Sequence, residues 1–281
     1  MFKEFFIDGK KVKDLYINGK KVKLQSEPSE FLGLTFTAEE PNSTVAMSSK
    51  SSAPTLNLEY STDGSTWNTF TVGSTTITLS NIGDKVYFRG NNTSTATTNH
   101  DDANYFTGTG KVSISGNLQS ILDSENFEDI VDLPDAAFAG LFQNMTSLVD
   151  AGDAKITANG NIGKNAFAYM FIRCNITRQL QIPELFASAK ARAFNSMFSD
   201  CPKITTIMLP DVTNVISSDC DYMFNSYCGG RYGIQSSLLS ADVKYSGPLY
   251  GTMFQYTFNY KTTLKCITVN FPAWGPFGVT Q

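Results

Sequence analysis

The sequence predicts a mainly β protein with short helices, in which N-terminal β-hairpins and an antiparallel β-sandwich precede a solenoid of stacked repeats. Three observations lead to this prediction. The first 24 residues contain a tandem duplication, the next stretch alternates apolar and polar residues, and the remainder carries a pair of apolar residues at nearly constant spacing. We place the boundaries at 1–27 for the hairpins, 28–117 for the sandwich and 118–281 for the repeats.

Composition narrows the classes of function. The chain has 281 residues, of which 41% are hydrophobic and 17% charged, as in a folded protein with a buried core. A net charge of −4 gives no reason to expect nucleic acid as a partner. No window of about 18 apolar residues free of charge is present, so we expect no membrane insertion. The first residues place Asp8 and several lysines before any apolar run, which is not the pattern of a secretion signal.

The N-terminal duplication predicts two small β-hairpins. Residues 5–13 and 15–23 each run from an apolar stretch through Asp-Gly or Asn-Gly to Lys-Lys-Val-Lys. Asp-Gly and Asn-Gly are the preferred central residues of two-residue hairpin turns. Such hairpins are marginal alone in water, so we interpret them as an anchor that docks on a larger assembly. The alternative is a solvated basic arm, since the segment carries seven Lys against three acidic residues. The candidate anchoring residues are Phe6, Ile7, Tyr16 and Ile17.

The sandwich is predicted from short runs rich in Thr, Ser and Val with a period of two. Turn signals such as Asp63-Gly64 and Gly83-Asp84 separate these runs at intervals near ten residues. This spacing favours an antiparallel β-sandwich. The six candidate strands are 33–38, 55–60, 69–72, 76–79, 85–89 and 111–115.

Two features of this region could serve a ligand. Trp67 follows the Asp63-Gly64 turn, and we interpret it as a core or rim aromatic rather than a binding platform. The insert 91–104 is a polar loop in which His100 precedes Asp101 and Asp102. A calcium loop needs alternating oxygen ligands and a closing carboxylate, which the insert lacks, so we predict no metal site and no cofactor.

The repeats begin after a short helix predicted at 118–127. Each copy contains a Met-Phe or Leu-Phe pair, and the Phe residues follow one another at intervals of 29, 27, 26 and 30. A period of 20–30 residues with recurring apolar positions is typical of a leucine-rich-repeat-like α/β solenoid, in which each copy buries the apolar face of its neighbour. The five pairs are Leu141-Phe142, Met170-Phe171, Met197-Phe198, Met223-Phe224 and Met253-Phe254.

The second and third copies match most closely and predict the parts of a repeat. We expect strands at Leu180–Ile182 and Ile207–Leu209, each ended by a Pro that cannot donate to a ladder. The Ala-Phe-x-x-Met-Phe segment is predicted as a helical turn. Cys174 and Cys201 stand at equivalent positions and are predicted to be small buried hydrophobes, because the chain has no close Cys pair for zinc and only one His.

This pattern resembles a known repeat family. Ile162-Gly163 followed by Ala166-Phe167, then Cys174 and the closing Ile182-Pro183, looks like the BspA-type leucine-rich repeat. That repeat occurs in surface proteins of Bacteroides and related anaerobes and in proteins of their phages. The resemblance is strong over about 160–210 and weaker over 135–281, where Met145 stands in place of Cys in the first copy.

The N-terminal modules are similar to modules of virion proteins from phages that infect Bacteroidales, including crAss-like phages. The residues that carry this likeness are the hairpins, the stretch from Tyr60 to Trp67 and the stretch from Gly83 to Gly90. In such proteins a short N-terminal segment anchors a fibre and the C-terminal part is displayed. The resemblance implies other virion proteins as partners of the N-terminus and, by analogy, a homo-oligomer such as a trimer.

No catalytic constellation is evident in the sequence. The single His leaves Ser-His-Asp and Cys-His arrangements only one base, which lies in a different module from every Cys. The pairs Asp150 with Asp153 and Asp219 with Asp221 could in principle hydrolyse a glycoside, but such pairs are common in solvated loops. We therefore predict that the protein is not an enzyme.

A binding surface is predicted near the C-terminus. Seven of the twelve Tyr lie between positions 222 and 260, and Trp274 follows. Tyr and Trp offer large contact areas with a polar tip, which suits recognition of glycans and proteins, although they could equally pack the last repeats. The candidate ligand-binding residues are Tyr222, Tyr227, Tyr232, Tyr245, Tyr250 and Trp274.

Together these observations predict a virion structural protein, a head or tail fibre or decoration protein, that displays repeats for attachment to a host-surface glycan or protein. It would be made in the host cytoplasm and located in the virion, since a phage protein leaves its host by lysis. The alternative is a bacterial cell-surface adhesin with leucine-rich repeats, for which a signal peptide or lipobox is expected.

Overall fold

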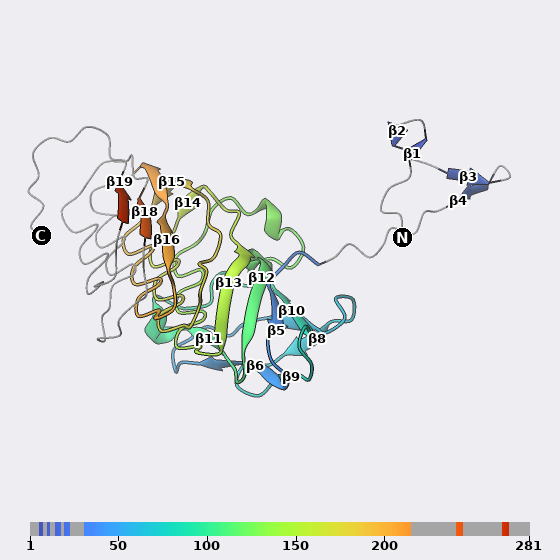
Figure 1. The fold of residues 1–281 in the computed structure, drawn as a ribbon, viewed down its shortest axis with the longest axis horizontal. Helices are drawn as coiled ribbons and strands as arrows, with labels where there is room; N and C mark the ends of the chain where they lie inside the picture. Colours follow the sequence, from blue (N-terminus) through green and yellow to red (C-terminus); the bar gives the residue numbers. More distant parts are fainter. Residues whose placement is uncertain are drawn as a thin grey trace, which may run out of the picture. The chain divides into compact units, whose positions relative to one another are not determined.

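The computed structural model describes residues 31–214 in full and, outside that range, only the backbone of six short strands (Figure 1). The chain divides into two compact units, Met1–Phe31 and Leu32–Gln281. Its described part is mainly β, with several sheets and only short 3₁₀ helices. The domain boundary predicted between residues 117 and 118 falls within the second unit and stays a prediction.

The smaller unit contains two antiparallel hairpins, as the duplication predicted. Strand β1 (Phe6–Ile7) pairs with β2 (Lys10–Lys11), and β3 (Leu15–Ile17) pairs with β4 (Lys20–Val22). Two residues separate the strands of each hairpin, Asp8-Gly9 in the first and Asn18-Gly19 in the second. The predicted anchoring residues Phe6, Ile7, Tyr16 and Ile17 belong to β1 and β3, and their side chains lie outside what the structure describes.

The larger unit begins with two sheets that pack face to face. One has the strand order β13-β12-β5-β10-β7-β8 and the other β11-β6-β9. All pairs among β5 to β12 are antiparallel. The strands span β5 (Thr35–Ala38), β6 (Ser43–Ser49), β7 (Leu58–Ser61), β8 (Asn68–Phe70), β9 (Thr76–Leu79), β10 (Lys85–Gly90), β11 (Asn104–Thr107) and β12 (Val112–Asn117).

Six of these strands were predicted from the sequence, and two were missed. Strand β6 buries Ser43, Val45 and Met47. Because one of these inward residues is a Ser, the alternation of apolar and polar residues along the strand is weak. Strand β11 begins at Asn104, which the sequence assigned to the polar loop. The predicted loop was therefore wrong at its last residue. Asn104 is buried in the strand because its side-chain amide donates to the carbonyl oxygens of Pro54 (2.8 Å) and Thr95 (3.3 Å).

Phenylalanine side chains fill the space between the two sheets. The ring centroids of Phe36 and Phe106 lie 4.8 Å apart, and those of Phe88 and Phe106 lie 5.0 Å apart. All three residues are fully buried. Edge-to-face and tilted contacts of this kind add about 0.5–1.5 kcal/mol per pair to the gain from burial.

A short 3₁₀ helix, η2 (Leu118–Ile121), follows β12, and η3 (Phe127–Asp129) comes after it. The predicted helix at 118–127 is therefore present only as two single turns. Gln119 in η2 is fully buried and uses both ends of its amide. It donates to the carbonyl oxygen of Phe127 (2.7 Å) and accepts from the backbone N–H groups of Thr157 and Ala158 (2.7 Å each).

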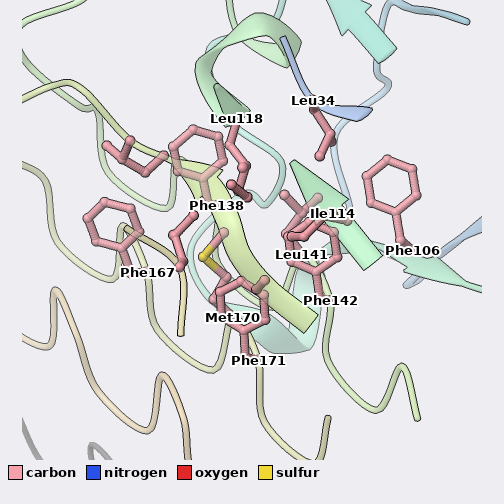
Figure 2. Close-up of a cluster of buried hydrophobic side chains, with 14 of the residues drawn as sticks. Leu34, Phe106, Ile114, Leu118, Phe138, Leu141, Phe142, Phe167, Met170 and Phe171 are labelled. Carbon is pink, nitrogen blue, oxygen red and sulfur yellow. The ribbon is translucent and has the colours of Figure 1, made fainter. Parts of the chain in front are cut away.

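Strand β13 (Leu148–Lys155) continues the larger sheet into the repeats. It pairs in parallel with β12, beside which it lies in Figure 1. The buried side chains on both sides of this junction belong to one hydrophobic cluster that runs from Leu34 to Val212. Figure 2 shows this continuity, with Ile114 and Leu118 next to Phe138 and Phe142.

Parallel strands then stack from one repeat to the next. Strands β14 (Asn161–Ile162), β15 (Leu185–Ala189) and β17 (Asp211–Asn214) form one three-stranded sheet. Strands β16 (Thr206–Leu209), β18 (Ser240–Val243) and β19 (Cys266–Val269) form another. The predicted strand Ile207–Leu209 is β16 and ends before Pro210, whereas Leu180–Ile182 makes only a single bridge, between Gln181 and Lys155.

The Ala-Phe segments are not helical, and the prediction of a helical turn was wrong. We call residues 135–145, 163–174 and 190–201 the turn segments. Every fourth residue in them has a positive φ, between 53° and 63°, which breaks an α-helix after each turn. The residues in this conformation are Ala136, Gly140, Asn144, Asn165, Tyr169, Arg173, Arg192, Ser196 and Asp200.

This backbone satisfies its hydrogen bonds in two alternating ways. One set of N–H groups donates to the carbonyl three residues earlier, as from Met170 to Phe167 (3.2 Å). The intervening N–H groups donate to the next turn segment, as from Phe138 to Ala166 (2.7 Å) and from Phe167 to Ala193 (2.8 Å). A helix would keep all of these donors to itself, so the positive φ values are what allow neighbouring segments to bond.

Two columns of Phe run through the interior of the turn segments. Phe142, Phe171 and Phe198 stack with centroid distances of 5.1 and 5.4 Å, and their planes are within 13° of parallel. Phe138, Phe167 and Phe194 form the second column, at 5.9 and 5.3 Å. All six residues are fully buried, and the first two members of each column are visible in Figure 2.

Cys174 and Cys201 are fully buried, as predicted. Each thiol also donates a hydrogen bond to the backbone carbonyl of a Phe in the preceding segment, Phe142 for Cys174 and Phe171 for Cys201, at an S–O distance of 3.0 Å. Burial raises the pKa of the Cys174 thiol well above its ordinary value. These positions therefore serve packing and leave the thiol in its protonated form.

Candidate ligand-binding site

The polar loop of the sandwich, residues 91–103, is held in shape by its own side chains. Asn99 caps the 3₁₀ helix η1 (His100–Asp102), and its side chain accepts from the N–H of Asp101 (2.7 Å). The Asp102 carboxylate in turn accepts from the N–H groups of Thr98 (3.0 Å) and Asn99 (2.9 Å) and from the Thr98 hydroxyl. This reciprocal arrangement is a capping box, which fixes the loop tip.

The electrostatics of Asp102 reflect this role. Burial alone would raise the pKa of the Asp102 carboxyl. The hydrogen bonds from Thr98, Asn99 and Thr97 together outweigh that effect and lower the pKa below its usual value. Asp102 is therefore ionised at neutral pH and is occupied as a structural acceptor, which leaves it no capacity to act as a proton donor there.

The loop tip docks on the outer side of the turn segments. The Gln143 amide donates to the carbonyl oxygen of His100 (3.0 Å), and the Asn165 amide donates to that of Thr98 (2.8 Å). Gly140, with a φ of 63°, makes the close approach possible, because a Cβ there would lie 3.0 Å from the Cβ of His100. The loop thus crosses two successive segments, at 140–143 and at 165.

The His100 ring stacks on the Tyr169 ring. Their centroids are 3.6 Å apart and their planes are 17° from parallel. Gly140 and Tyr169 occupy equivalent positions, since both have positive φ and both donate to the next segment, to Ala168 and Asn195 respectively. His100 therefore fills the place that a side chain at position 140 would take above Tyr169. The imidazole Nε2 lies 3.3 Å from the Asp101 carboxylate.

A pocket of about 320 Å³ lies where this loop meets the segments. Its walls come from the sandwich loop and from the second and third turn segments. The lining residues are Asn99, His100, Asp101, Asn165, Tyr169, Arg192 and Asn195. The volume falls at the small end of the range of small-molecule sites, about 300–1,000 Å³. The lining combines amides, rings and one group of each charge, which suits binding through hydrogen bonds.

Two amides of the lining keep hydrogen-bonding capacity after the contacts of the fold are made. Asn165 is 7% exposed, and its amide nitrogen bonds Thr98. Asn195 is 6% exposed, and its amide oxygen accepts from the Ser196 hydroxyl (2.8 Å). Within residues 31–214, the Oδ1 atom of Asn165 and the Nδ2 atom of Asn195 have no hydrogen-bond partner. Neither atom is among the enclosed polar atoms that lack a partner, so both are open to solvent at the pocket, where a ligand or water can reach them.

The acidic pair considered for hydrolysis has another role. Arg178 donates from Nε to both Asp150 oxygens (2.9 and 3.1 Å) and from its terminal nitrogens to both Asp153 oxygens (3.0 and 3.3 Å). Asp153 first and Asp150 next raise the pKa of the Arg178 guanidinium. The two carboxylates thus bind one cation and join β13 to the following repeat. Asp219 and Asp221 lie outside the described residues.

Trp67 lies at the rim of the sandwich and is half-buried. The Arg89 guanidinium sits 4.1 Å from the centre of its ring and pairs with the Glu59 carboxylate at 2.7 Å. The cation covers one face of the indole, so that face is not available to stack on a ligand. This arrangement agrees with the prediction of a rim aromatic.

Within residues 31–214, no three His, Cys, Asp or Glu side chains come together as metal ligands would. In the same range no helix is long and apolar enough to span a bilayer.

The predicted binding residues Tyr222, Tyr227, Tyr232, Tyr245, Tyr250 and Trp274 lie outside the described residues. Sequence reasoning missed the pocket residues Asn165, Tyr169, Arg192 and Asn195. One signal was present, because Asn195 stands where the preceding copies have a small apolar residue, Ala168 and Ala139. These residues contact the loop at 98–101. Thr98 lies 67 positions before Asn165, so no local pattern in the sequence indicated the contact.

Comparisons with known proteins do not assign the chain. No family model matches it, and neither a curated protein nor a solved structure matches it. The function must therefore be argued from the residues and their geometry.

Proposed function

We propose that this protein is a non-enzymatic attachment protein of a virion, in which the repeats form a leucine-rich-repeat type solenoid displayed for binding to a host surface. The hairpins at the N-terminus would bind other virion proteins, through Phe6, Ile7, Tyr16 and Ile17. The Tyr-rich residues after position 220 would contact a host-surface glycan or protein. Assembly as a homo-oligomer, a trimer by analogy, completes the proposal.

The observation that carries the proposal is the single core shared by the sandwich and the turn segments. Parallel pairing of β12 with β13 and the bonds of Gln119 tie the two parts together. Such a junction resists bending, because a hinge would have to expose the Phe columns to water. A rigid support that holds a distal surface at a fixed distance is what an attachment protein needs.

The solenoid interpretation rests on the regular bonding between segments. The N–H groups of one turn segment donate to the next at five alternate positions in both junctions, from 136–144 to 164–172 and from 165–173 to 191–199. The Phe rings of each segment stack on those of its neighbours, and Phe142 of the first segment also packs on Phe106 of the sandwich. Nearest-neighbour stacking of this kind is the defining property of a solenoid.

The test of the virion assignment is mass spectrometry of purified particles from a host culture that produces this chain. Peptides from all three parts of the sequence are expected at a constant ratio to the capsid protein. Absence of the chain from intact particles would refute the assignment. Antibody against the hairpin segment, compared with antibody against residues 31–214, tests the orientation, since only the second should bind undamaged particles.

The test of attachment uses purified protein and host cells. Replacing Tyr232, Tyr245 and Trp274 together with Ala is expected to abolish binding to cells. Matched replacement of Tyr60, Tyr87 and Tyr105, half-buried residues of the sandwich, serves as the control for loss of aromatic surface. Unchanged binding by a folded triple variant would show that the Tyr-rich residues are not the contact surface.

A second candidate is a bacterial cell-surface adhesin with leucine-rich repeats, which the same resemblance favours. Cell fractionation separates the two. An adhesin is recovered with the envelope of the bacterium that encodes it, whereas a virion protein is recovered with particles after lysis.

A further inference from the structure

The geometry points to a binding site for a neutral saccharide in the pocket between the polar loop and the turn segments. This site is distinct from the Tyr-rich residues of the proposed attachment surface, and it does not depend on whether the protein belongs to a virion. We infer that one uncharged sugar residue, a hexose or N-acetylhexosamine at the end of a glycan, binds there. The contacts would be made by Asn165, Asn195, Arg192 and Asp101.

Asn195 carries the argument because the two preceding segments have no amide at this position. The equivalent position in the two preceding segments is Ala168 and Ala139, which are 1% and 0% exposed. Stacking is therefore satisfied by a methyl group there. Asn195 has no positive φ to explain a preference for Asn, and its Nδ2 atom finds no partner within residues 31–214. Asn195 lines the pocket, so this donor is available to a ligand there.

The lining offers both kinds of hydrogen-bonding atom at fixed places. The Asn165 side chain is oriented by its bond to Thr98, which leaves Oδ1 as an acceptor. The Asn195 side chain is oriented by its bond from Ser196, which leaves Nδ2 as a donor. A hydroxyl group donates and accepts at once, so a polyhydroxylated ligand can satisfy both atoms. A purely apolar ligand would displace water from both atoms and leave them unpaired.

The charges of the lining favour an uncharged ligand. Arg192 contributes one positive charge and Asp101 one negative charge. An anionic sugar would gain from Arg192 but would also face the Asp101 carboxylate. Vicinal hydroxyls can accept from a guanidinium and donate to a carboxylate together, which uses both groups.

The size and construction of the pocket agree with a single sugar residue. Its volume of about 320 Å³ is small for a drug-like ligand, and its walls come from two distant parts of the chain that are fixed to each other. The polar atoms are thus held before a ligand arrives, which lowers the entropy lost on binding. The His100 and Tyr169 rings add apolar surface to a lining that is otherwise polar.

The experiment is calorimetric titration of the full chain with methyl glycosides of glucose, galactose, mannose and N-acetylglucosamine, and with glucuronic and N-acetylneuraminic acids as anionic probes. We expect at least one neutral glycoside to bind more tightly than both acids. The variant Asn195→Ala, which installs the residue of the preceding segments, should weaken that binding about 3- to 10-fold, the effect of one lost hydrogen bond. Arg192→Gln should weaken it by a similar factor.

The matched control is Arg173→Gln, which removes the same charge from a positive-φ position of the second turn segment that does not line the pocket. The Arg173→Gln variant should bind the neutral glycoside with the same affinity as the unchanged protein. Circular dichroism and melting curves establish that each variant is folded. The inference is overturned if no neutral glycoside binds, if only the acids bind, or if folded Asn195→Ala and Arg192→Gln both bind as before. Cell attachment measured alongside distinguishes this site from the Tyr-rich surface, which these variants leave intact.

Discussion

The imidazole of His100 lies flat on the phenol ring of Tyr169, with 3.6 Å between the ring centroids. The two residues come from different parts of the fold, the polar loop of the sandwich and the second turn segment. Their contact fixes the loop over the segments and forms one side of the pocket.

Replacing Tyr169 with Ala should loosen the loop tip. An aromatic pair contributes about 0.5–1.5 kcal/mol beyond its burial, so amide hydrogen exchange at residues 98–102 should become several-fold faster. Tyr169→Phe keeps the stacked ring and is the control, with exchange close to that of the unchanged protein. Equal protection of the loop in the Ala variant would mean that the stack does not hold it.

Gly140→Ala should destabilise the protein by about 1 kcal/mol, because a Cβ meets the Gln143 amide at 2.7 Å and the His100 Cβ at 3.0 Å. The positive φ of Gly140 (63°) also strains any residue with a Cβ, although Ala136, four residues earlier, adopts a similar φ of 55°. Ala136→Gly is therefore the matched control and should change stability by less than about 0.5 kcal/mol. Urea denaturation measures the unfolding free energy of both variants. Changes of equal size for Gly140→Ala and Ala136→Gly would refute the steric explanation.

Phe171→Ala should cost about 3–5 kcal/mol of unfolding free energy, since the ring is fully buried between Phe142 and Phe198. Phe171→Leu keeps much of the volume and should cost less. Ile82→Ala, at a residue that is 66% exposed, is the control and should lie within about 0.5 kcal/mol of the unchanged protein. If chemical denaturation showed only a small loss of unfolding free energy for Phe171→Ala, the Phe column would not be a main source of stability.

Cys174 and Cys201 should resist alkylation in the folded protein. Both are buried, and burial raises the pKa of the Cys174 thiol, so little thiolate is present at pH values near 8. Treatment with iodoacetamide followed by peptide mapping measures each cysteine separately. Labelling in urea is the control, in which both should react fully. Rapid labelling of either residue without denaturant would show that the segments open readily.

Acid should weaken the loop through Asp102. The pKa of its carboxyl is lower in the folded protein than in the unfolded chain, where it is about 3.9. The stabilisation is therefore present above about pH 4 and is lost as the pH falls through the lower folded value. At pH 7 Asp102→Asn should lower stability by about 1 kcal/mol.

The difference between Asp102→Asn and the unchanged protein should shrink when the melting curves are repeated near pH 3. Asp101→Asn is the neighbouring control, because the Asp101 side chain is 79% exposed and does not cap the loop. A difference for Asp102→Asn that stays constant with pH would exclude the titration of Asp102 as its cause.

Much of the architecture could be predicted from local patterns. The Asp-Gly and Asn-Gly pairs indicated both hairpins, and period-2 runs indicated six of the eight strands from β5 to β12. The offset of 27 residues between Phe171 and Phe198 indicated that these rings are equivalent, and they stack. Each of these signals lies within a short window or repeats at a fixed spacing, so no knowledge of distant contacts is needed.

The errors arose where distant parts of the chain decide the outcome. The turn segments were predicted as helical because Ala, Phe and Met in that spacing suit a helix. Hydrogen bonds between segments, such as that from the Phe171 N–H to the Met197 carbonyl oxygen, favour instead a backbone with a positive φ at every fourth residue. Asn104 was assigned to a loop because the burial of its amide depends on Pro54 and Thr95, which the local pattern does not reveal.

The sequence by itself determined the hairpins, most strands of the sandwich and the equivalence of the repeats, because short-range alternation and fixed spacing specify them. Only the tertiary structure decided that His100 lies on Tyr169, that Gly140 leaves room for it, and that Asn165 and Asn195 line the same pocket. The physical reason is that a pocket depends on which surfaces meet. That meeting is set by the packing of a loop against segments some 40 to 95 residues further along the chain.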